Sequence, residues 1–599
     1  MMRGYSFLFI LIVTTSILFT NRPIIASTGN RTESSMYRDT AAAQKRREQS
    51  LMKVREEHQR WIVNGMQTQG KKPAFAAPRS VNKSIPRFRG KNNSIETATQ
   101  SIFPDFTFGS NGTVRSNIND GDGTDDEAFA VAVQSNGKII AAGKSYDYSI
   151  PDYEIALTRY NSDGTIDNTF GLDGTIRSFI YEGANIDDEA RAIAIQPDGK
   201  IVIAGSSVAS LSYATNFAVA RYDSNGHPDN TFGISGNESF FIAQGDSFDD
   251  EARAVAIQPD GKIIAAGFSE SGPSYSNAFA LVRLKADGSF DSTFGTNGSV
   301  ISNVTGGDGS DDYITSLVLQ PDGKVVVAGS SRNGVSETTA FAVARFNSNG
   351  SPDNTFGTSG SVRTFIAGGD STVDIAYSVA LTTDGKIVAA GSSQSASPTA
   401  YAFALARYTS AGLLDNIFGS DGTTRGFISG GSNLDDICTS IAIRPDGTIA
   451  AGGYSEDSTF HNAFAIALFD STGENESLRN YISTNSDDDF AYSLALTSDG
   501  KIVSAGVSQT SGRAFAAARY VIQPVGITTL SATGVGDNSA TLNGEVNAGG
   551  LSLTVRFLYG TTTAVYTDSV AASPSPVGGD SSVSISALLR NLALNTTYY

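Results

Sequence analysis

The sequence predicts an all-β fold: a seven-bladed β-propeller closed by N-terminal strand exchange and followed by an incomplete β-sandwich. Three observations predict it. A unit of about 62 residues recurs after residue 100, and seven copies can be counted. Each unit holds four strand-like segments, which describes a propeller blade. One surplus strand segment at the front of the array matches one missing segment at its back.

Residues 1–26 read as a secretory signal peptide. Arg3 is followed by an apolar run from Phe7 to Phe19, and cleavage after Ala26 fits the pattern. The run is shorter than the roughly 20 residues that cross a bilayer, and no later stretch is longer. We therefore expect a secreted or cell-surface protein with no transmembrane segment in the mature chain.

Residues 27–100 form a basic polar linker. From residue 28 it carries 15 Lys and Arg against 6 Asp and Glu, with no strand alternation. Residues 41–63 have helix-like spacing of apolar side chains, with Gly65 placed to end the helix. This segment is either solvated or a helix that binds a partner or the cell envelope.

The repeats occupy residues 101–523. In the third unit the strand segments are Ala252 to Gln258, Lys262 to Gly267, Phe279 to Leu284 and Ser299 to Val304. A Pro-Asp-Gly-Lys turn joins the first two segments, and its glycine tolerates positive φ. That glycine recurs in five steps of 62 residues and one of 53, at Gly137, Gly199, Gly261, Gly323, Gly385, Gly447 and Gly500.

The ends of the array predict how the ring closes. Thr107 to Ile118 matches the last strand of a unit, although no unit precedes it. The seventh unit runs from Asp488 to Tyr520 and leaves the pattern at Pro524 without a fourth strand. Pairing the two within one blade would leave neither edge exposed to aggregation.

Residues 524–599 are rich in Thr, Ser and Val and alternate as a β-sandwich does. With Tyr559 and the stretch from Asn591 to Tyr599, the segment resembles a truncated fibronectin type III-like domain. As written it ends before the last strands of that family, so we expect either that the chain is a fragment or that this domain is incomplete.

The unit DxxFAVAxQxDGKIIxAGxSxxxxxxFAxxRYNxDGxxDxTFGxxG, from Asp105 to about Tyr520, resembles the delta-60 repeat of bacterial secreted proteins. That family is a β-propeller family of unknown molecular function. The resemblance implies the fold and export, and it implies no reaction. Two departures stand out: Val373 replaces an Asp in the fifth unit, and Leu468 replaces an Arg in the sixth.

Charge and composition exclude several functions. Residues 101–599 carry 26 Lys and Arg against 55 Asp and Glu, which disfavours binding to nucleic acid. None of the three histidines, His58, His227 and His461, lies in a pattern that suggests a nucleophile and its base. Cys438, the single cysteine, falls on a repeated Ala position, so we predict that its small side chain is buried and packs in the core.

Pairs of aspartates precede the first strand of each unit and are the strongest polar feature. Either they form an acidic ring that binds a cation or basic ligand, or each accepts hydrogen bonds from nearby backbone amides. The candidate ligand-binding residues are Asp125, Asp126, Asp187, Asp188, Asp249, Asp250, Asp311, Asp312, Asp435 and Asp436, with Asp374 alone and Asp488-Asp489 in the remaining units.

Calcium is a narrower hypothesis. The Gly-rich segment from Asn119 to Asp125 offers Asp120, Asp122 and Asp125 as oxygen ligands, although it does not follow the twelve-residue calcium loop. No cofactor is otherwise required.

The connections between second and third strands vary from unit to unit, and loops that vary on a rigid scaffold are common recognition sites. They carry aromatic side chains suited to sugars or proteins, and the candidates are Tyr146, Tyr148, Tyr213, Tyr275 and Tyr454. The Arg that ends each third strand is instead predicted to pair with an Asp or a carbonyl at the outer turn, at Arg159, Arg221, Arg283, Arg345, Arg407 and Arg519.

These patterns favour a non-enzymatic binding or adhesion module that recognises an extracellular glycan or protein through one acidic face, and we expect a monomer. A carboxylate-dependent glycosidase or lyase and a structural surface-layer component are the alternatives.

Overall fold

The computed structural model describes most of the chain beyond residue 98. The described residues are 99–118, 125–147, 152–180, 187–208, 214–242, 249–271, 276–304, 311–332, 338–366, 373–394, 400–428, 434–473, 475–482, 487–510, 512–536, 538–547, 552–553, 555–559, 568–578, 581–593 and 596. The predicted signal peptide and the predicted basic linker up to residue 98, with its helix at 41–63, lie outside them, whereas Thr99 and Gln100 of the predicted linker begin a strand. Every regular element in the described part is a β-strand, and none of it is a helix that could cross a membrane.

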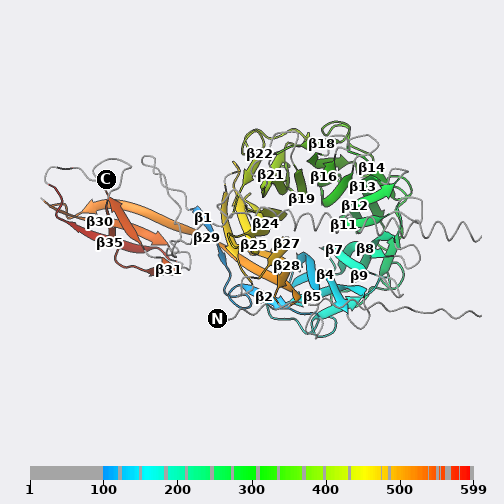
Figure 1. Cartoon of the computed structure of the whole chain (residues 1–599), viewed down its shortest axis with the longest axis horizontal. Coiled ribbons are helices and arrows are strands. Elements are labelled where there is room, and N and C mark those ends of the chain that lie inside the picture. The colour runs from blue at the N-terminus through cyan, green and yellow to red at the C-terminus, as the bar shows by residue number, and fades with distance from the viewer. Residues whose placement is uncertain are drawn as a thin grey trace, which may run out of the picture. The chain divides into compact units, whose positions relative to one another are not determined.

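Antiparallel sheets of four strands make up the repeat region, and the described strands form seven such sets. We call each set a blade and number the blades from β3 onward (Figure 1). The first strand of each blade is innermost: β3 (Asp126–Val133), β7 (Asp188–Ile195), β11 (Asp250–Ile257), β15 (Asp312–Leu319), β19 (Val373–Leu381), β23 (Asp436–Ile443) and β27 (Asp489–Leu496). Each inner strand contacts the next, and β27 contacts β3, so the inner strands form a closed ring.

The second and third strands are the long central strands of each blade. The second strands are β4 (Ile139–Asp147), β8 (Ile201–Val208), β12 (Ile263–Ser271), β16 (Val325–Arg332), β20 (Ile387–Gln394), β24 (Ile449–Glu456) and β28 (Ile502–Gln509). The third strands are β5 (Asp152–Tyr160), β9 (Thr215–Tyr222), β13 (Ser276–Leu284), β17 (Thr339–Phe346), β21 (Tyr401–Tyr408), β25 (Asn462–Phe469) and β29 (Arg513–Thr533).

The fourth strands are short and lie outermost. They are β6 (Thr175–Ser178), β10 (Asn237–Phe240), β14 (Ser299–Ser302), β18 (Ser361–Thr364), β22 (Thr423–Gly426), β26 (Asn475–Asn480) and, in blade 7, β2 (Thr113–Ser116).

The repeated Ala-Gly pair of the second strand has a steric cause. A Cβ on Gly267 would lie 1.8 Å from the carbonyl oxygen of Glu251 on the inner strand, so only glycine fits. Beside this contact the inner strand has a β-bulge between Ala252 and Ala254, and the same irregularity recurs in the other blades. A bulge turns a side chain in a new direction, which matters for the inner face of the ring.

Neighbouring blades bury apolar side chains between their faces. Between blades 3 and 4, for example, Ile264 and Phe279 pack with Ile314, Val325 and Phe346, and all five are almost fully buried. At roughly 1.5–3 kcal/mol for each large side chain removed from water, these layers are the main source of stability.

Ring closure occurs as the sequence predicts. Strand β2, near the start of the chain, pairs antiparallel with β29 from Thr113 opposite Ala518 to Ser116 opposite Phe515. Phe108, Val503 and Phe515 share one core cluster with residues of blade 1, so blade 7 also packs on blade 1. The predicted strand exchange is confirmed.

In six of the seven blades the arginine near the end of the third strand makes the predicted pair. Arg283 Nε lies 2.8 Å from Asp291 of the same blade, and Arg283 NH1 donates to the carbonyl oxygen of Ser348 in blade 4 at 2.5 Å. We call this arrangement the Arg–Asp clamp. At the closure Arg519 pairs with Asp105 at 2.8 Å, although 414 residues separate them, and it also donates to the carbonyl of Ser162 in blade 1.

Blade 6 lacks the clamp. Leu468 stands where the arginine would be, and residues 470–474 alone connect β25 to β26, so the Asp-bearing Thr-Phe-Gly turn is missing too. Strand β1 (Thr99–Pro104) occupies this joint, pairing with β29 from Thr99 opposite Val525 to Pro104 opposite Tyr520. Ile102 of β1 is 4% exposed and packs in one cluster with Leu468. An apolar contact from the N-terminal strand thus replaces the missing ion pair.

The C-terminal segment has its own small core. Strand β29 continues to Thr533 and pairs with β30 (Ser539–Asn547), which pairs with β35 (Val583–Arg590). Two further pairs are β31 (Ser552–Leu553) with β34 (Val577–Gly578) and β32 (Arg556–Tyr559) with β33 (Asp568–Ala571). Their core contains Val546, Phe557, Val577, Ile585 and Ala587. The boundary predicted at 523/524 falls inside β29, and the fibronectin type III assignment stays a prediction.

Candidate binding site on the inner wall of the ring

The second aspartate of each pair is a structural group. In blade 3, Asp250 is fully buried, accepts a hydrogen bond from the Ile242 amide at 2.6 Å and lies opposite Ser269 of β12. Equivalent bonds hold Asp126, Asp188, Asp312, Asp374, Asp436 and Asp489. These carboxylates fix the connection from one blade to the next. The prediction that Asp126, Asp188, Asp250, Asp312 and Asp436 contact a ligand is wrong, because the fold encloses them.

The first aspartate of each pair ties two blades together. Asp249 of blade 3 accepts hydrogen bonds from the amide and hydroxyl of Thr215, which begins the third strand of blade 2. Asp187, Asp311, Asp435 and Asp488 accept the corresponding amide bonds. Asp125 is half-buried, and its backbone forms a bridge with Arg513. The backbone-amide hypothesis therefore accounts for these residues as well.

The other candidates of the sequence analysis are only partly described. Asp120 and Asp122 lie outside the described residues, as do Tyr148, Tyr213 and Tyr275. Within the described ranges no group of three or more His, Cys, Asp or Glu is placed to hold a metal ion, and the calcium loop stays a prediction.

The two described tyrosines belong to strands rather than to loops. Tyr146 ends β4, with its ring 5.0 Å from that of Tyr153. Tyr454 lies in β24, with its ring 5.0 Å from that of Phe490 on an inner strand. Cys438 is fully buried as predicted, and burial raises the pKa of its thiol to about 12.

Sequence reasoning missed the inner wall of the ring. We use this name for two positions of each inner strand, the residue after the buried aspartate and the bulged residue two further on. The first set is Glu127, Glu189, Glu251, Tyr313, Ile375, Ile437 and Phe490, and the second is Phe129, Arg191, Arg253, Thr315, Tyr377, Thr439 and Tyr492. The seven units differ in chemistry at these positions, where acidic, basic, aromatic and aliphatic side chains alternate. Comparing these two columns across the repeats, rather than the turns, would have revealed it.

Blades 1 to 3 contribute a row of ion pairs. Lys144 Nζ lies 2.6 Å from Glu189, and Glu189 also contacts Arg191 at 2.5 Å. Arg191 Nε lies 3.3 Å from Glu251 of the next blade, and Glu251 accepts from Arg253 at 3.1 Å. The side chains in these ion pairs are partly buried. The pairs cross the boundary between blades 1 and 2 and the boundary between blades 2 and 3, so each charged group helps to position the next.

The row keeps the Glu251 carboxylate ionised. Burial alone would raise the pKa of Glu251, but the charges of Arg253 and Arg191 outweigh it, and the pKa lies below its usual value. At the other end Arg513 of blade 7 pairs with Glu127 of blade 1. The row thus runs from blade 7 to blade 3.

Aromatic rings lie side by side along blades 6, 7 and 1. Tyr454 of blade 6 meets Phe490 of blade 7, and Phe490 stacks on Tyr492 with centroids 6.4 Å apart. Tyr492 in turn lies 5.7 Å from Phe129 of blade 1. Burial raises the pKa of Tyr492 and Tyr454, so these phenols are neutral. Blades 6, 7 and 1 therefore present a continuous aromatic row.

Arginines of the charged row also lie against aromatic rings. The Arg191 guanidinium lies 4.3 Å from the centroid of Phe129, and that of Arg253 lies 4.8 Å from Phe268 and 5.6 Å from Tyr313. The inner wall thus combines ring faces with paired guanidinium and carboxylate groups, which suits stacking and directed hydrogen bonding to a polar ligand.

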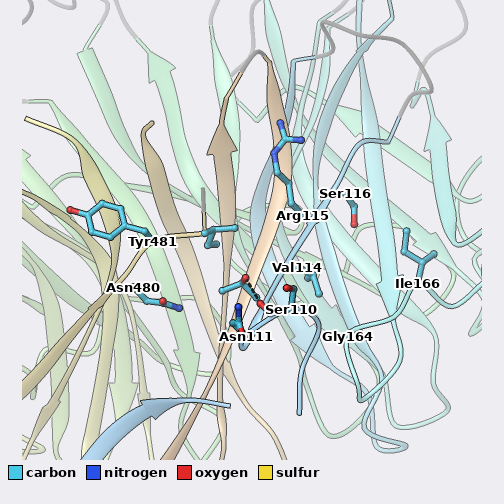
Figure 2. Close-up of a pocket in the computed structure, with 11 residues that line it drawn as sticks. Ser110, Asn111, Val114, Arg115, Ser116, Gly164, Ile166, Asn480 and Tyr481 are labelled. Atoms are coloured by element: carbon cyan, nitrogen blue, oxygen red, sulfur yellow. Dashed lines mark hydrogen bonds between the residues drawn. The ribbon is translucent and has the colours of Figure 1, made fainter. Parts of the chain in front are cut away.

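A separate pocket of about 490 Å³ lies at the outer rim, between β2, the end of β26 and a turn of blade 1 (Figure 2). Ser110, Arg115, Asn480 and Tyr481 are among its lining residues. Figure 2 shows the Tyr481 ring leading away from the other side chains, and its hydroxyl donates to Asp457 at 2.6 Å. The groups here do not converge, so we favour the inner wall.

The sheets, the ring of inner strands and the clamps define a repeat-built β-propeller. Five segments, residues 134–170, 196–232, 258–294, 320–356 and 382–418, match the family model described as "Domain of unknown function (DUF5122) beta-propeller". These five matches are consistent with the resemblance of the repeats to the delta-60 repeat propeller family. None of the curated protein sequences matches the chain.

Several solved structures are similar in fold. Drosophila Semaphorin 1a, extracellular domains 1-2, is 9% identical, with 68% of this chain and 88% of that chain covered and a TM-score of 0.35. The β-propeller domain of the Trilobed protease from Pyrococcus furiosus is 12% identical, with 65% and 93% covered and a TM-score of 0.34. Trypanosoma rangeli sialidase is 9% identical, with 68% and 59% covered and a TM-score of 0.32. These similarities are distant and involve proteins of different kinds, so they do not indicate an activity for this chain.

Proposed function

We propose that this chain is an extracellular, non-enzymatic binding protein that holds a glycan against the inner wall of its propeller. The observation that carries the proposal is the break in repetition at the inner wall, where scaffold residues give way to one charged and one aromatic row. Tyrosine and phenylalanine rings stack on the apolar faces of sugars, and ionised side chains hydrogen-bond their hydroxyl groups.

The state of Glu251 on the inner wall favours binding over hydrolysis. A glycosidase needs one carboxylic acid with a raised pKa to protonate the leaving group. Glu251 has the opposite shift, and Glu189 contacts two cations, Lys144 and Arg191. Glu251 is therefore suited to hold its arginine partners in place rather than to deliver a proton.

A glycan-binding screen with the full-length protein tests the proposal, followed by calorimetry on any glycan that binds. Tyr492→Ala removes a ring that contacts Phe490 and Phe129, and we expect about fivefold to tenfold weaker binding. Phe106→Ala is the matched control, because Phe106 is 67% exposed in a turn outside the inner wall. Equal losses in both variants, or no glycan bound at all, would contradict the proposal.

Two further measurements separate the alternatives. Release of shorter sugars from the bound glycan, lost in Glu251→Gln, would instead favour the carboxylate-dependent enzyme. Repeating the binding with calcium and with a chelator tests the predicted loop at Asp120 and Asp122, since binding that vanishes on chelation would place a metal ion in the recognition site.

A further inference from the structure

Arg253 occupies a distinct place at the end of the charged row. Its Nε and NH2 atoms lie 3.1 and 3.4 Å from the two oxygens of Glu251. Beyond it the inner-wall positions of blade 4 hold Tyr313 and Thr315, so the row has no further carboxylate there. A third of the Arg253 side chain, 33%, is exposed. This guanidinium is therefore paired with Glu251, lies beside the Phe268 and Tyr313 rings, and remains partly exposed.

The row as a whole has an excess of positive charge. Its cations are Arg513, Lys144, Arg191 and Arg253, and its carboxylates are Glu127, Glu189 and Glu251. The rest of the chain beyond residue 100 is strongly acidic, with 55 Asp and Glu in all against 26 Lys and Arg. A cationic row inside an acidic body discriminates between ligands by charge.

Two tyrosines, Tyr313 and Tyr377, interact with Arg253. The guanidinium lies 5.6 Å from the Tyr313 ring centroid. Burial raises the pKa of Tyr377 in blade 5, and the charge of Arg253 opposes that rise, so Tyr377 also lies within its electrostatic reach. A ligand between these groups would meet a cation and two phenol rings together.

The geometry points to an acidic saccharide as the ligand, with a uronate-type carboxylate bound by Arg253 and the sugar ring placed against Tyr313 and Tyr377. This inference rests on the proposed function and names the ligand class for the same site. Arginine forms paired, charge-assisted hydrogen bonds with a carboxylate, and the same sugar presents an apolar face to an aromatic ring. Glu251 holds the guanidinium in orientation for this contact, as a positioning residue.

The test compares ligands that differ only in charge. Oligogalacturonate and a glucuronate-containing oligosaccharide are each measured by calorimetry against their carboxyl-reduced forms, in which every carboxylate is a neutral hydroxymethyl group. For at least one of the two sugars we expect the carboxylated form to bind the wild-type protein about tenfold or more tightly, the scale of one charge-assisted contact.

Two arginine variants locate the effect. Arg253→Gln should weaken binding of the carboxylated sugar until both forms bind within about twofold, with the neutral form unchanged. Arg115→Gln removes the same charge from an exposed side chain on the outer strand β2 and should keep the tenfold preference.

The outcomes separate this inference from the proposal beneath it. Equal binding of charged and neutral sugars by the wild-type protein overturns the acidic ligand and leaves glycan binding standing. An equal effect of both arginine variants overturns the role of Arg253 and indicates only long-range attraction. If neither form of either sugar binds while the screen finds another glycan, the ligand class is wrong, and if no glycan binds, the proposed function fails first.

Discussion

The ion pair that closes the ring offers the sharpest test of the fold, because an internal twin exists for it. Asp105 accepts from Arg519 Nε at 2.8 Å, from Lys501 at 3.1 Å and from the Thr107 hydroxyl at 2.6 Å. Asp291 of blade 3 has the same set of partners, Arg283, Lys262 and Thr293, at 2.8, 3.2 and 2.7 Å. The two sites differ mainly in connectivity.

Through these local contacts, Asp105→Asn and Asp291→Asn should therefore lower the free energy of unfolding by the same amount. Asp105 is 4% exposed and Asp291 is 3% exposed, so each change leaves a buried guanidinium without its charge partner. Breaking such a pair costs about 3–5 kcal/mol, and we expect the lower end because the arginine keeps its carbonyl bond to the next blade. Chemical denaturation of the wild-type protein and both variants under the same conditions measures this loss of unfolding free energy.

Only Asp105→Asn should also loosen the ring. Asp291 and Arg283 lie eight residues apart, so their turn stays attached when the pair is broken. Asp105 and Arg519 are 414 residues apart, and their pair holds the N-terminal strands on blade 7. Hydrogen exchange of β2 should accelerate in Asp105→Asn and remain slow in Asp291→Asn. The reasoning is refuted if β2 is equally protected in both variants, or equally exposed in both.

Three further outcomes follow from the described contacts. The pKa of Asp105 is lowered to about 2, against burial, by its hydrogen bonds to Thr107 and Lys501 and by the charge of Arg519, so its stabilisation is complete above pH 3.8 and is lost as pH falls toward 2. Acid unfolding followed by circular dichroism should show this loss, and Asp105→Asn should flatten the pH dependence in that window. Ile102→Asp should destabilise the protein by about 3 kcal/mol through a charge buried at the joint of blades 6 and 7. Ile301→Asp, at a side chain 43% exposed on β14, should change stability little, and similar losses in both would contradict the role of β1. Cys438 should resist a thiol reagent until the protein unfolds, because it is fully buried with a pKa of about 12, whereas rapid labelling under native conditions would show that blades 5 and 6 open there.

The repeated features were predictable because each occurs many times. The Asp-Gly-Lys turns, the clamp of Arg159 and its equivalents, and the pairing of β2 in blade 7 all follow from comparing units with one another. Charge at the inner wall escaped that comparison, since Arg191 and Arg253 occupy a column that holds Phe, Thr or Tyr elsewhere. Repeat comparison reveals the positions that the units share, whereas the candidate site consists of positions at which they differ.

Other features depend on contacts that no local pattern encodes. Leu468 was visible as a departure, but its compensation by Ile102 joins segments that are hundreds of residues apart. Tyr454 was expected in a variable loop because it follows the apolar run of the second strand. In the structure that strand continues to Glu456 and includes Tyr454. The boundary at 523/524 followed a change in composition, whereas the strand alternation continues through it and β29 does not end there.

That continuous strand has a mechanical consequence. Tension between the propeller and the C-terminal module would run along β29, parallel to its own axis. The strand is flanked by β28 on one side and by β2 and β1 on the other, with four paired positions in β2 and six in β1. Pulling along a strand loads its cross-strand hydrogen bonds together rather than one after another. The N-terminal strands β1 and β2, which complete the ring, thus also help β29 to resist a pull on the C-terminal module.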